Sequence, residues 1–251
     1  MKKVLSIFLS LGLLFTFVGC GSDNKEGAKE ITISAAASLE DPMNEIIKKY
    51  EAENSNIKIN TNYGSSRSLR KQIQEGGKVD LFLSASKDET DELISIGSVK
   101  EDEVKEFLTN GLMLVKSGGS KEDINSIKDL PSITGKIALG AEGVPIGDYS
   151  REALKNRGVW DKIQSNIVFC KDAKLVLNYV KSGDVDYAIV YANEINNLGD
   201  AKLVEKIDGS LHDPTIYTFA NINVENKDVQ NFKDFINENI DIFEKYNFER
   251  K

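Results

Sequence analysis

Short apolar runs alternate with amphipathic segments along the chain from residue 31 onward. The first run, ITISAAAS, has the pattern of a buried strand, and the next segment repeats apolar residues at the spacing of one helix face. These residues are Met43, Ile46, Ile47 and Tyr50. The pattern predicts a helix at about 41–53, followed by a strand, a helix and a strand at 57–64, 65–77 and 79–85. Such a succession is typical of a parallel sheet covered by helices.

The alternation starts again near residue 110 and predicts a second α/β unit. Its expected strands lie at 110–118, 136–140, 166–170 and 185–191. Helices are expected after the turn GVPIGDY, ending near Gly158, and after Asp172, which is placed as a helix N-cap. The two units together predict an α/β fold with two lobes.

The end of the chain contains one more strand, at 215–222, and a helix at about 227–246 that should pack back on the first sheet. The chain is therefore expected to cross between the lobes near 108–112 and to return near 192–200. No Pro/Ser-rich linker separates the units, which favours hinge strands over a flexible tether. The expected division is lobe 1 at 30–110 plus 196–251 and lobe 2 at 111–195.

The first twenty residues have a different pattern. Two lysines precede an apolar run that ends in FVGC, as in a secretory signal peptide, and the run is short for a membrane-spanning helix. The ending resembles the lipobox of bacterial lipoproteins, which implies cleavage after Gly19 and a lipid on Cys20. We expect a signal peptide at 1–19 and a lipidated cysteine with a polar tether at 20–29, with an ordinary membrane anchor as the alternative. The mature protein would be exported and held by its lipid at the outer face of the bacterial cytoplasmic membrane.

The formal net charge of −8 narrows the function classes. Non-specific nucleic-acid binding depends on neutralising phosphates, so an acidic chain is a poor candidate for it. Besides Cys20 the chain has one cysteine, Cys170, whose apolar neighbours in NIVFC indicate a buried thiol that acts as a small hydrophobe. The single histidine, His212, lies in the polar segment SLHDP, where we expect a surface loop.

Small and hydroxyl-bearing residues gather where the expected strands pass into helices. Ser38 follows three alanines, Ser65 and Ser66 follow a Tyr-Gly pair, and the turns GVPIGDY and KDAK open two further helices. These turns lie at the carboxyl ends of the strands, where ligands bind in open α/β sheets. Helix N-termini there offer unpaired N–H groups and a partial positive charge, which favour an anion. Taken alone, each of Ser38 and Ser66 fits a helix N-cap better than a ligand contact, and Tyr191 would fit a half-buried packing residue between the lobes. The anion site is supported by the recurrence of such turns in both lobes.

Motifs of common catalytic and metal sites are missing from the sequence. There is no Cys/His cluster, no G-x-S-x-G elbow and no phosphate-binding loop of the G-x-x-x-x-G-K-[ST] type. A sensibly placed Ser-His-Asp set is missing too, because His212 lies in an unrelated polar segment. We therefore expect no enzyme, no metal-cation site and no cofactor.

Several segments, in order over nearly all of the mature chain, resemble the motifs of molybdate-binding proteins, the substrate-binding components of molybdate ABC transporters. They are AAASL, YGSSRSLRKQIQEGGKVDLFLSA, NGLMLV, GVPIGDYSREALKNRGVW and GDVDYAIVYANE. The resemblance implies a type II periplasmic-binding-protein fold, in which two α/β lobes close on a tetrahedral oxyanion. It further implies an ABC permease as partner and a monomeric protein.

By motif position, the resemblance places the oxyanion contacts on five residues. Three contribute hydroxyls and two contribute backbone N–H groups: Ser38, Ser66 and Tyr191, then Ile146 and Ala173. Ile146 and Ala173 depart from the alanine and valine of the family pattern, but each acts through its N–H. Arg67 replaces a small residue beside Ser66, and we expect its guanidinium to point to solvent.

The function implied is extracytoplasmic capture of molybdate, and also of tungstate, for delivery to the permease. The nearest alternative is a binding protein for another anion, such as sulfate or an organic anion. A secreted hydrolase that uses Ser66 and a surface adhesin without a ligand are alternatives from other classes.

Overall fold

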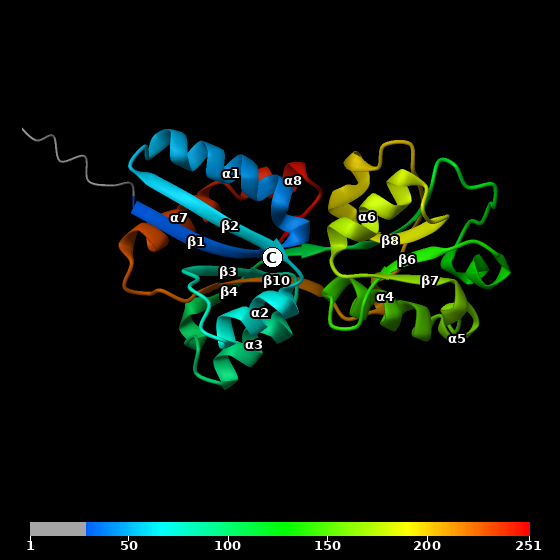
Figure 1. Cartoon of the computed structure of the whole chain (residues 1–251), viewed down its shortest axis with the longest axis horizontal. Coiled ribbons are helices and arrows are strands. Elements are labelled where there is room, and N and C mark those ends of the chain that lie inside the picture. Colours follow the sequence, from blue (N-terminus) through cyan, green and yellow to red (C-terminus); the bar gives the residue numbers. More distant parts are fainter. Residues whose placement is uncertain (1–28) are drawn as a thin grey trace, which may run out of the picture.

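The computed structural model describes residues 29–251, which form two α/β lobes side by side (Figure 1). The expected signal peptide at 1–19, the lipidated Cys20 and the tether up to residue 28 lie outside the described residues. The tether expected at 20–29 is one residue too long, because β1 (Lys29–Ala36) already begins at Lys29. Within residues 29–251, no helix is both long enough and apolar enough to cross a membrane.

The first lobe is built on a six-stranded sheet with strand order β11-β4-β10-β3-β1-β2. Besides β1, its strands are β2 (Ile57–Gly64), β3 (Leu81–Ser84), β4 (Val104–Asn110), β10 (Thr215–Asn221) and β11 (Glu249–Arg250). Its helices are α1 (Glu40–Glu53), α2 (Ser66–Gln74), α3 (Lys87–Ser95), α7 (Lys227–Glu238) and α8 (Ile240–Lys245). Because β1 is parallel to β2 and β3, the carboxyl ends of these strands meet at the edge that faces the second lobe.

The second lobe has a five-stranded sheet with strand order β7-β6-β8-β5-β9. The strands are β5 (Leu112–Lys116), β6 (Ile137–Gly140), β7 (Ile167–Cys170), β8 (Tyr187–Tyr191) and β9 (Lys202–Lys206). The helices are α4 (Pro145–Asn156), α5 (Trp160–Ile163) and α6 (Ala173–Ser182). Since β6 is parallel to β7 and β8, the carboxyl ends of these three strands also share one edge.

The chain passes between the lobes twice. At the first crossing, Gly111 separates β4 of the first sheet from β5 of the second. The return lies between Ile207 and Thr215, because β9 still pairs with β5 in the second sheet. The boundary expected at residue 196 is therefore too early. The sequence of β9, KLVEK, has charged residues at three of its five positions, so the strand has no apolar signature.

The helices differ from the sequence analysis in two places: one helix was not predicted, and one predicted helix is divided. Helix α3 was not predicted from the apolar periodicity, because its buried residues are Glu89, Thr90 and Leu93 and most of its inward face is therefore polar. The single helix expected at 227–246 is two helices, α7 and α8, which are separated at Asn239. The Asn239 side chain donates to the Phe235 carbonyl at 2.8 Å, a local bond of the kind that competes with helix continuation.

Each lobe has an apolar core of its own. In the first lobe, Phe107 of β4 packs against Phe219 and Phe243, with ring centroids 5.4 and 5.7 Å apart. In the second lobe, Leu114 and Ile189 are fully buried between neighbouring strands and helices. Among the described residues, none of the buried apolar clusters extends from one lobe into the other. The lobes can therefore move as separate bodies about the two crossings.

Candidate functional site

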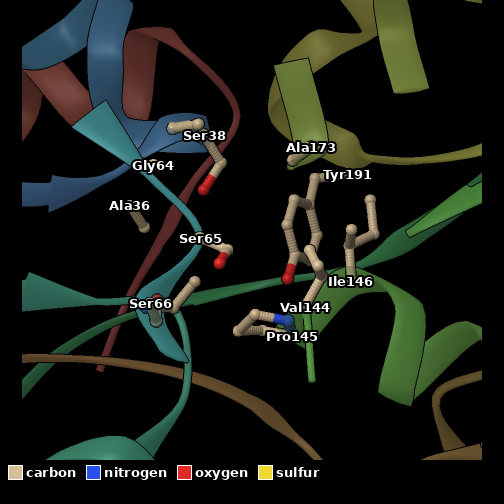
Figure 2. Close-up of a pocket in the computed structure, with 12 residues that line it drawn as sticks. Ala36, Ser38, Gly64, Ser65, Ser66, Val144, Pro145, Ile146, Ala173 and Tyr191 are labelled. Atoms are coloured by element: carbon tan, nitrogen blue, oxygen red, sulfur yellow. The ribbon is translucent and has the colours of Figure 1, made fainter. Parts of the chain in front are cut away.

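A pocket lies between the lobes, at the carboxyl ends of the parallel strands (Figure 2). All five residues expected to contact the ligand line it: Ser38, Ser66, Ile146, Ala173 and Tyr191. The first two follow β1 and β2 of the first lobe, and the other three follow or end β6, β7 and β8 of the second lobe. The fold thus brings together residues from five separate strand ends.

The pocket is lined by neutral groups. The remaining lining residues are small or apolar: Ala36, Ala37, Gly64, Ser65, Ala85, Val144 and Pro145. Among the described residues, no lysine, arginine, histidine, aspartate or glutamate lines it. Its cavity volume is about 10 Å³, roughly the space of one water molecule, so the lobes lie close together around the site. Any ligand that it holds in this arrangement must be small.

Ser66 is free of the capping role that sequence alone left open for it. Ser65 is the N-cap of α2, and its Oγ accepts from the Ser68 N–H at 3.3 Å. The Ser66 Oγ instead accepts from the Ala85 N–H at 2.9 Å. A hydroxyl that accepts one hydrogen bond still has its own proton to donate, so this contact leaves the Ser66 O–H available to the pocket.

Ser38 is held by residues of both lobes. It lies in a 3₁₀ turn, Ala37–Leu39, and makes no capping bond. Its Oγ is 2.9 Å from the Tyr217 hydroxyl, and its carbonyl accepts from the Asn193 amide at 3.2 Å. Asn110 donates in turn to Asn193 at 2.8 Å. Because burial raises the pKa of Tyr217, the phenol keeps its proton and can donate it to Ser38, whose own proton is then free for a ligand.

Sequence reasoning missed this supporting network. Tyr217 is fully buried near the start of β10, and its sequence context is that of an ordinary core aromatic residue. Asn110 and Asn193 lie inside two of the segments that carry the family resemblance, NGLMLV and GDVDYAIVYANE. Their position in those segments was the only available sign that they support the site. An asparagine next to a strand has many other possible roles, so the residue type alone does not indicate this one.

The two expected backbone donors lie in the first turns of helices. Ile146 is the second residue of α4 and Ala173 the first of α6, where N–H groups have no partner within the helix. Helix α4 approaches the end of β6 closely, and a Cβ on Gly140 would lie only 2.7 Å from the Gly147 nitrogen. Asp172 caps α6 as expected, accepting from the Leu175 N–H at 2.8 Å, so its carboxylate is turned to its own helix.

The Tyr191 hydroxyl points into the pocket from the end of β8 (Figure 2). The side chain is 1% exposed, and the hydroxyl has no hydrogen-bond partner among the described residues. Burial raises the pKa of Tyr191 well above the usual value of a tyrosine, so the hydroxyl stays a donor at physiological pH. A buried polar group without a partner costs about 1–3 kcal/mol, which a bound acceptor would offset.

We expect Tyr191→Phe to separate stability from binding. The variant removes an unsatisfied buried hydroxyl, so the melting temperature of the ligand-free protein should stay the same or rise. Oxyanion affinity should fall by about three- to tenfold, because one donor is lost. Thermal denaturation and calorimetric titration of the same preparation measure the two effects. A variant that melts lower and binds as tightly as wild type would show that this hydroxyl supports packing instead.

Three residues singled out from the sequence lie outside the pocket. Cys170 is buried at the end of β7, and burial raises the pKa of its thiol to about 11, in agreement with a hydrophobic role. His212 is not in an exposed loop: it is buried at the return crossing and packs on Tyr149 of α4, with ring centroids 5.9 Å apart. Arg67 does not simply point to solvent, because it pairs with Glu89 at 3.2 Å. Within residues 29–251, no three His, Cys, Asp or Glu side chains are grouped to hold a metal ion.

Two lobes with separate cores, two crossings and a neutral pocket between them define a binding protein that closes around a small ligand. The comparison with known families agrees: the chain belongs to the bacterial extracellular solute-binding proteins, which it matches over residues 31–249. It is therefore a solute-binding protein and not an enzyme, as expected.

Individual relatives cover nearly the same length. YvgL of Bacillus subtilis, named as a substrate-binding lipoprotein of an ABC transporter, is 35% identical over 99% of both chains. The molybdate-binding protein ModA of Haemophilus influenzae is 28% identical over 86% of this chain and 84% of its own. A solved structure described as the substrate-binding domain of a molybdenum ABC transporter from Clostridium difficile is 35% identical, covers 88% of this chain and 99% of its own, and has a TM-score of 0.67. The fold is thus the type II binding-protein fold that the resemblance implied.

Proposed function

We propose that this protein captures molybdate outside the cytoplasmic membrane and delivers it to an ABC permease. The observation that carries the proposal is the pocket, in which neutral donors from both lobes converge and no charged side chain is found among the described lining residues. Relatives named for molybdate binding support the choice of ligand. The proposed contacts are the hydroxyls of Ser38, Ser66 and Tyr191 and the N–H groups of Ile146 and Ala173.

Neutral donors can hold a dianion without a cationic side chain. Hydrogen bonds to a charged partner contribute about 1.5–3 kcal/mol each, so five converging donors can offset much of the cost of dehydrating the ion. The first turns of α4 and α6 add the partial positive charge of helix N-termini. Closure of the lobes excludes water and strengthens each of these interactions.

The donor-only character of the pocket also favours some anions over others. An anion that keeps a proton at neutral pH, such as phosphate, needs an acceptor for it. No carboxylate or histidine is among the described lining residues, so only hydroxyl oxygens could accept that proton, and a hydroxyl that turns to accept it no longer donates to the anion. Molybdate and tungstate are fully deprotonated tetrahedral dianions at neutral pH, and we propose that both bind. Sulfate has the same charge, and only the size of the cavity distinguishes it.

The setting of the protein belongs to the same proposal. A lipid on Cys20, after cleavage of residues 1–19, would anchor the protein at the outer face of the cytoplasmic membrane. We further propose that the protein is a monomer. The lipobox-like FVGC supports the lipid anchor, as does the relative YvgL, which is named as a lipoprotein. Globomycin treatment of producing cells, which blocks lipoprotein signal cleavage, should leave the uncleaved precursor.

Calorimetric titration of the purified mature chain with molybdate, tungstate, sulfate and phosphate tests the function. We expect tight binding of molybdate and tungstate, weak binding of sulfate and none of phosphate. Because a ligand that binds only the folded state stabilises it, molybdate should also raise the melting temperature. Tight sulfate binding without a response to molybdate would replace our assignment by the sulfate alternative. No response to any of the four anions would remove the oxyanion function.

A further inference from the structure

Two ion pairs join the lobes across the pocket. Lys174 of α6 lies with its Nζ 2.7 Å from Asp41 of α1, and Arg67 of α2 lies with its Nη2 3.7 Å from Asp148 of α4. In Figure 1, α1 and α6 lie above the line of the crossings, and α2 and α4 lie below it. The pairs therefore bridge the lobes on two sides of the site. The two pairs run in opposite directions: the first lobe contributes the cation of one pair, and the second lobe contributes the cation of the other.

Each charged residue is close in sequence to one of the proposed donors. Arg67 directly follows Ser66, and Lys174 directly follows Ala173. Asp41 comes three residues after Ser38, and Asp148 comes two residues after Ile146. Each ion pair thus connects a donor-bearing turn of one lobe to a donor-bearing turn of the other.

Surrounding contacts fix the Arg67 side chain in its crossing position. The buried carboxylate of Glu89 accepts from Arg67 at 3.2 Å, and its other oxygen accepts from Arg70. The guanidinium passes over Gly143, where a Cβ would lie 2.7 Å from the Arg67 Cδ. Asp148 also accepts from the Gly143 N–H at 3.0 Å. Arg67 therefore contacts the turn that leads into α4, the helix that carries the Ile146 donor.

Lys174 is similarly placed between acidic groups. Its side chain is about a quarter exposed, and partial burial disfavours its charge, yet the hydrogen bond to Asp41 raises the pKa of Lys174 overall. Glu194, buried just after β8, and Glu40 of α1 add to the attraction. The ammonium therefore stays charged while the lobes are together. Neither Lys174 nor Arg67 lines the pocket, so neither contacts the anion directly.

We propose that Arg67 and Lys174 are positioning residues that hold the two lobes closed over the bound anion. The inference rests on the proposed function and deepens it. Both pairs span the gap between bodies that have separate cores, so they exist only when the lobes are together. They stabilise the closed, liganded protein and contribute nothing to the folding of either lobe. Their loss acts on the rate at which the anion leaves.

The Asp41–Lys174 pair gives the sharper test, because Asp41 and Lys174 make no other side-chain hydrogen bonds among the described residues. The variants are Asp41→Asn, Lys174→Gln and the double variant, each titrated with molybdate and followed for anion release by stopped flow. Exposed ion pairs have small energies, so we expect each single variant to release the anion about two- to fivefold faster. The double variant should be no worse than either single one, because both remove the same interaction.

The sign of the Asp41→Asn effect separates this role from general electrostatics. Removing a negative charge near the site should by itself tighten anion binding, whereas loss of the cross-lobe pair weakens it. Lys87 and Asp91 provide the matched control, because they form a 2.7 Å pair within α3 of one lobe. Lys87→Gln and Asp91→Asn change the net charge equally and should leave anion release unchanged. Arg67→Gln should speed release as Lys174→Gln does.

The outcomes distinguish this inference from the function on which it rests. If wild type binds none of the four anions, the proposed function fails and the inference fails with it. If wild type binds molybdate but Asp41→Asn binds as tightly or more tightly, only the cross-lobe role is overturned. A lower melting temperature of the ligand-free variants with unchanged release would assign the pair a structural role, which also overturns the inference.

Discussion

Replacing Ser38 and Ser66 together by alanine is expected to weaken molybdate binding by about a hundredfold or more. Each hydroxyl supplies one hydrogen bond to a charged ligand, so each single substitution should cost about tenfold. The hydroxyls have different partners in the protein, Tyr217 for Ser38 and Ala85 for Ser66, so each substitution removes its own bond to the anion and leaves the protein contact of the other serine in place. Calorimetric titration of wild type, both single variants and the double variant measures the affinities directly.

A serine elsewhere in the first lobe provides the control. Ser95 is exposed at the end of α3 and, within residues 29–251, donates only to the Glu92 carbonyl of its own helix. Ser95→Ala should bind molybdate as wild type does. Circular dichroism of the double variant should match wild type, which rules out unfolding as the cause of weak binding. Wild-type affinity in the double variant would remove both serines from the proposed contact set.

Gly147→Ala is expected to have a comparable effect through the backbone. A methyl group on Gly147 would overlap the Gly140 carbonyl oxygen and lie 2.6 Å from that of Ala141. Both contacts are main-chain atoms that cannot rotate away, so α4 must move off the end of β6 and take the Ile146 N–H with it. We expect molybdate affinity to fall by about a hundredfold, since a displaced donor and a distorted pocket act together.

The same substitution should lower stability. Inserting a methyl group into a well-packed site costs about 1–3 kcal/mol, which corresponds to a drop of roughly 2–12 °C in melting temperature for a chain of this size. Gly119→Ala is the matched control in the same lobe, because a Cβ there meets nothing within 4 Å. If Gly147→Ala keeps both the melting temperature and the affinity of wild type, close contact between α4 and β6 is not required for the site.

Much of the site could be predicted because its residues follow a repeated local pattern. A buried strand that ends in small residues before a helix identifies Ser38 and Ser66, and the parallel strand pairing brings these turns to one edge. Periodicity alone could not separate Ser65 from Ser66, since both are good N-caps. Motif position in the family resemblance selected Ser66, and in the structure Ser65 is the residue that caps α2.

The parts that escaped prediction depend on pairing between distant segments. Strand β9 and helix α3 bury few apolar side chains, so neither has the period that reveals an element from sequence. The approach of Tyr217 to Ser38, 179 residues apart, is a product of the second crossing and has no local signal. The same holds for Arg67: only the folded chain shows that Asp148 and Gly143 of the other lobe lie within its reach.

The neutral lining of the pocket has an electrical consequence for the whole carrier. A bound dianion makes the protein more negative by the full charge of that anion, and among the described lining residues no cationic side chain offsets the charge locally. A filled carrier should consequently migrate faster toward the anode than an empty one in native electrophoresis. A membrane transporter with a suitably charged docking face could use that difference to recognise loaded carriers.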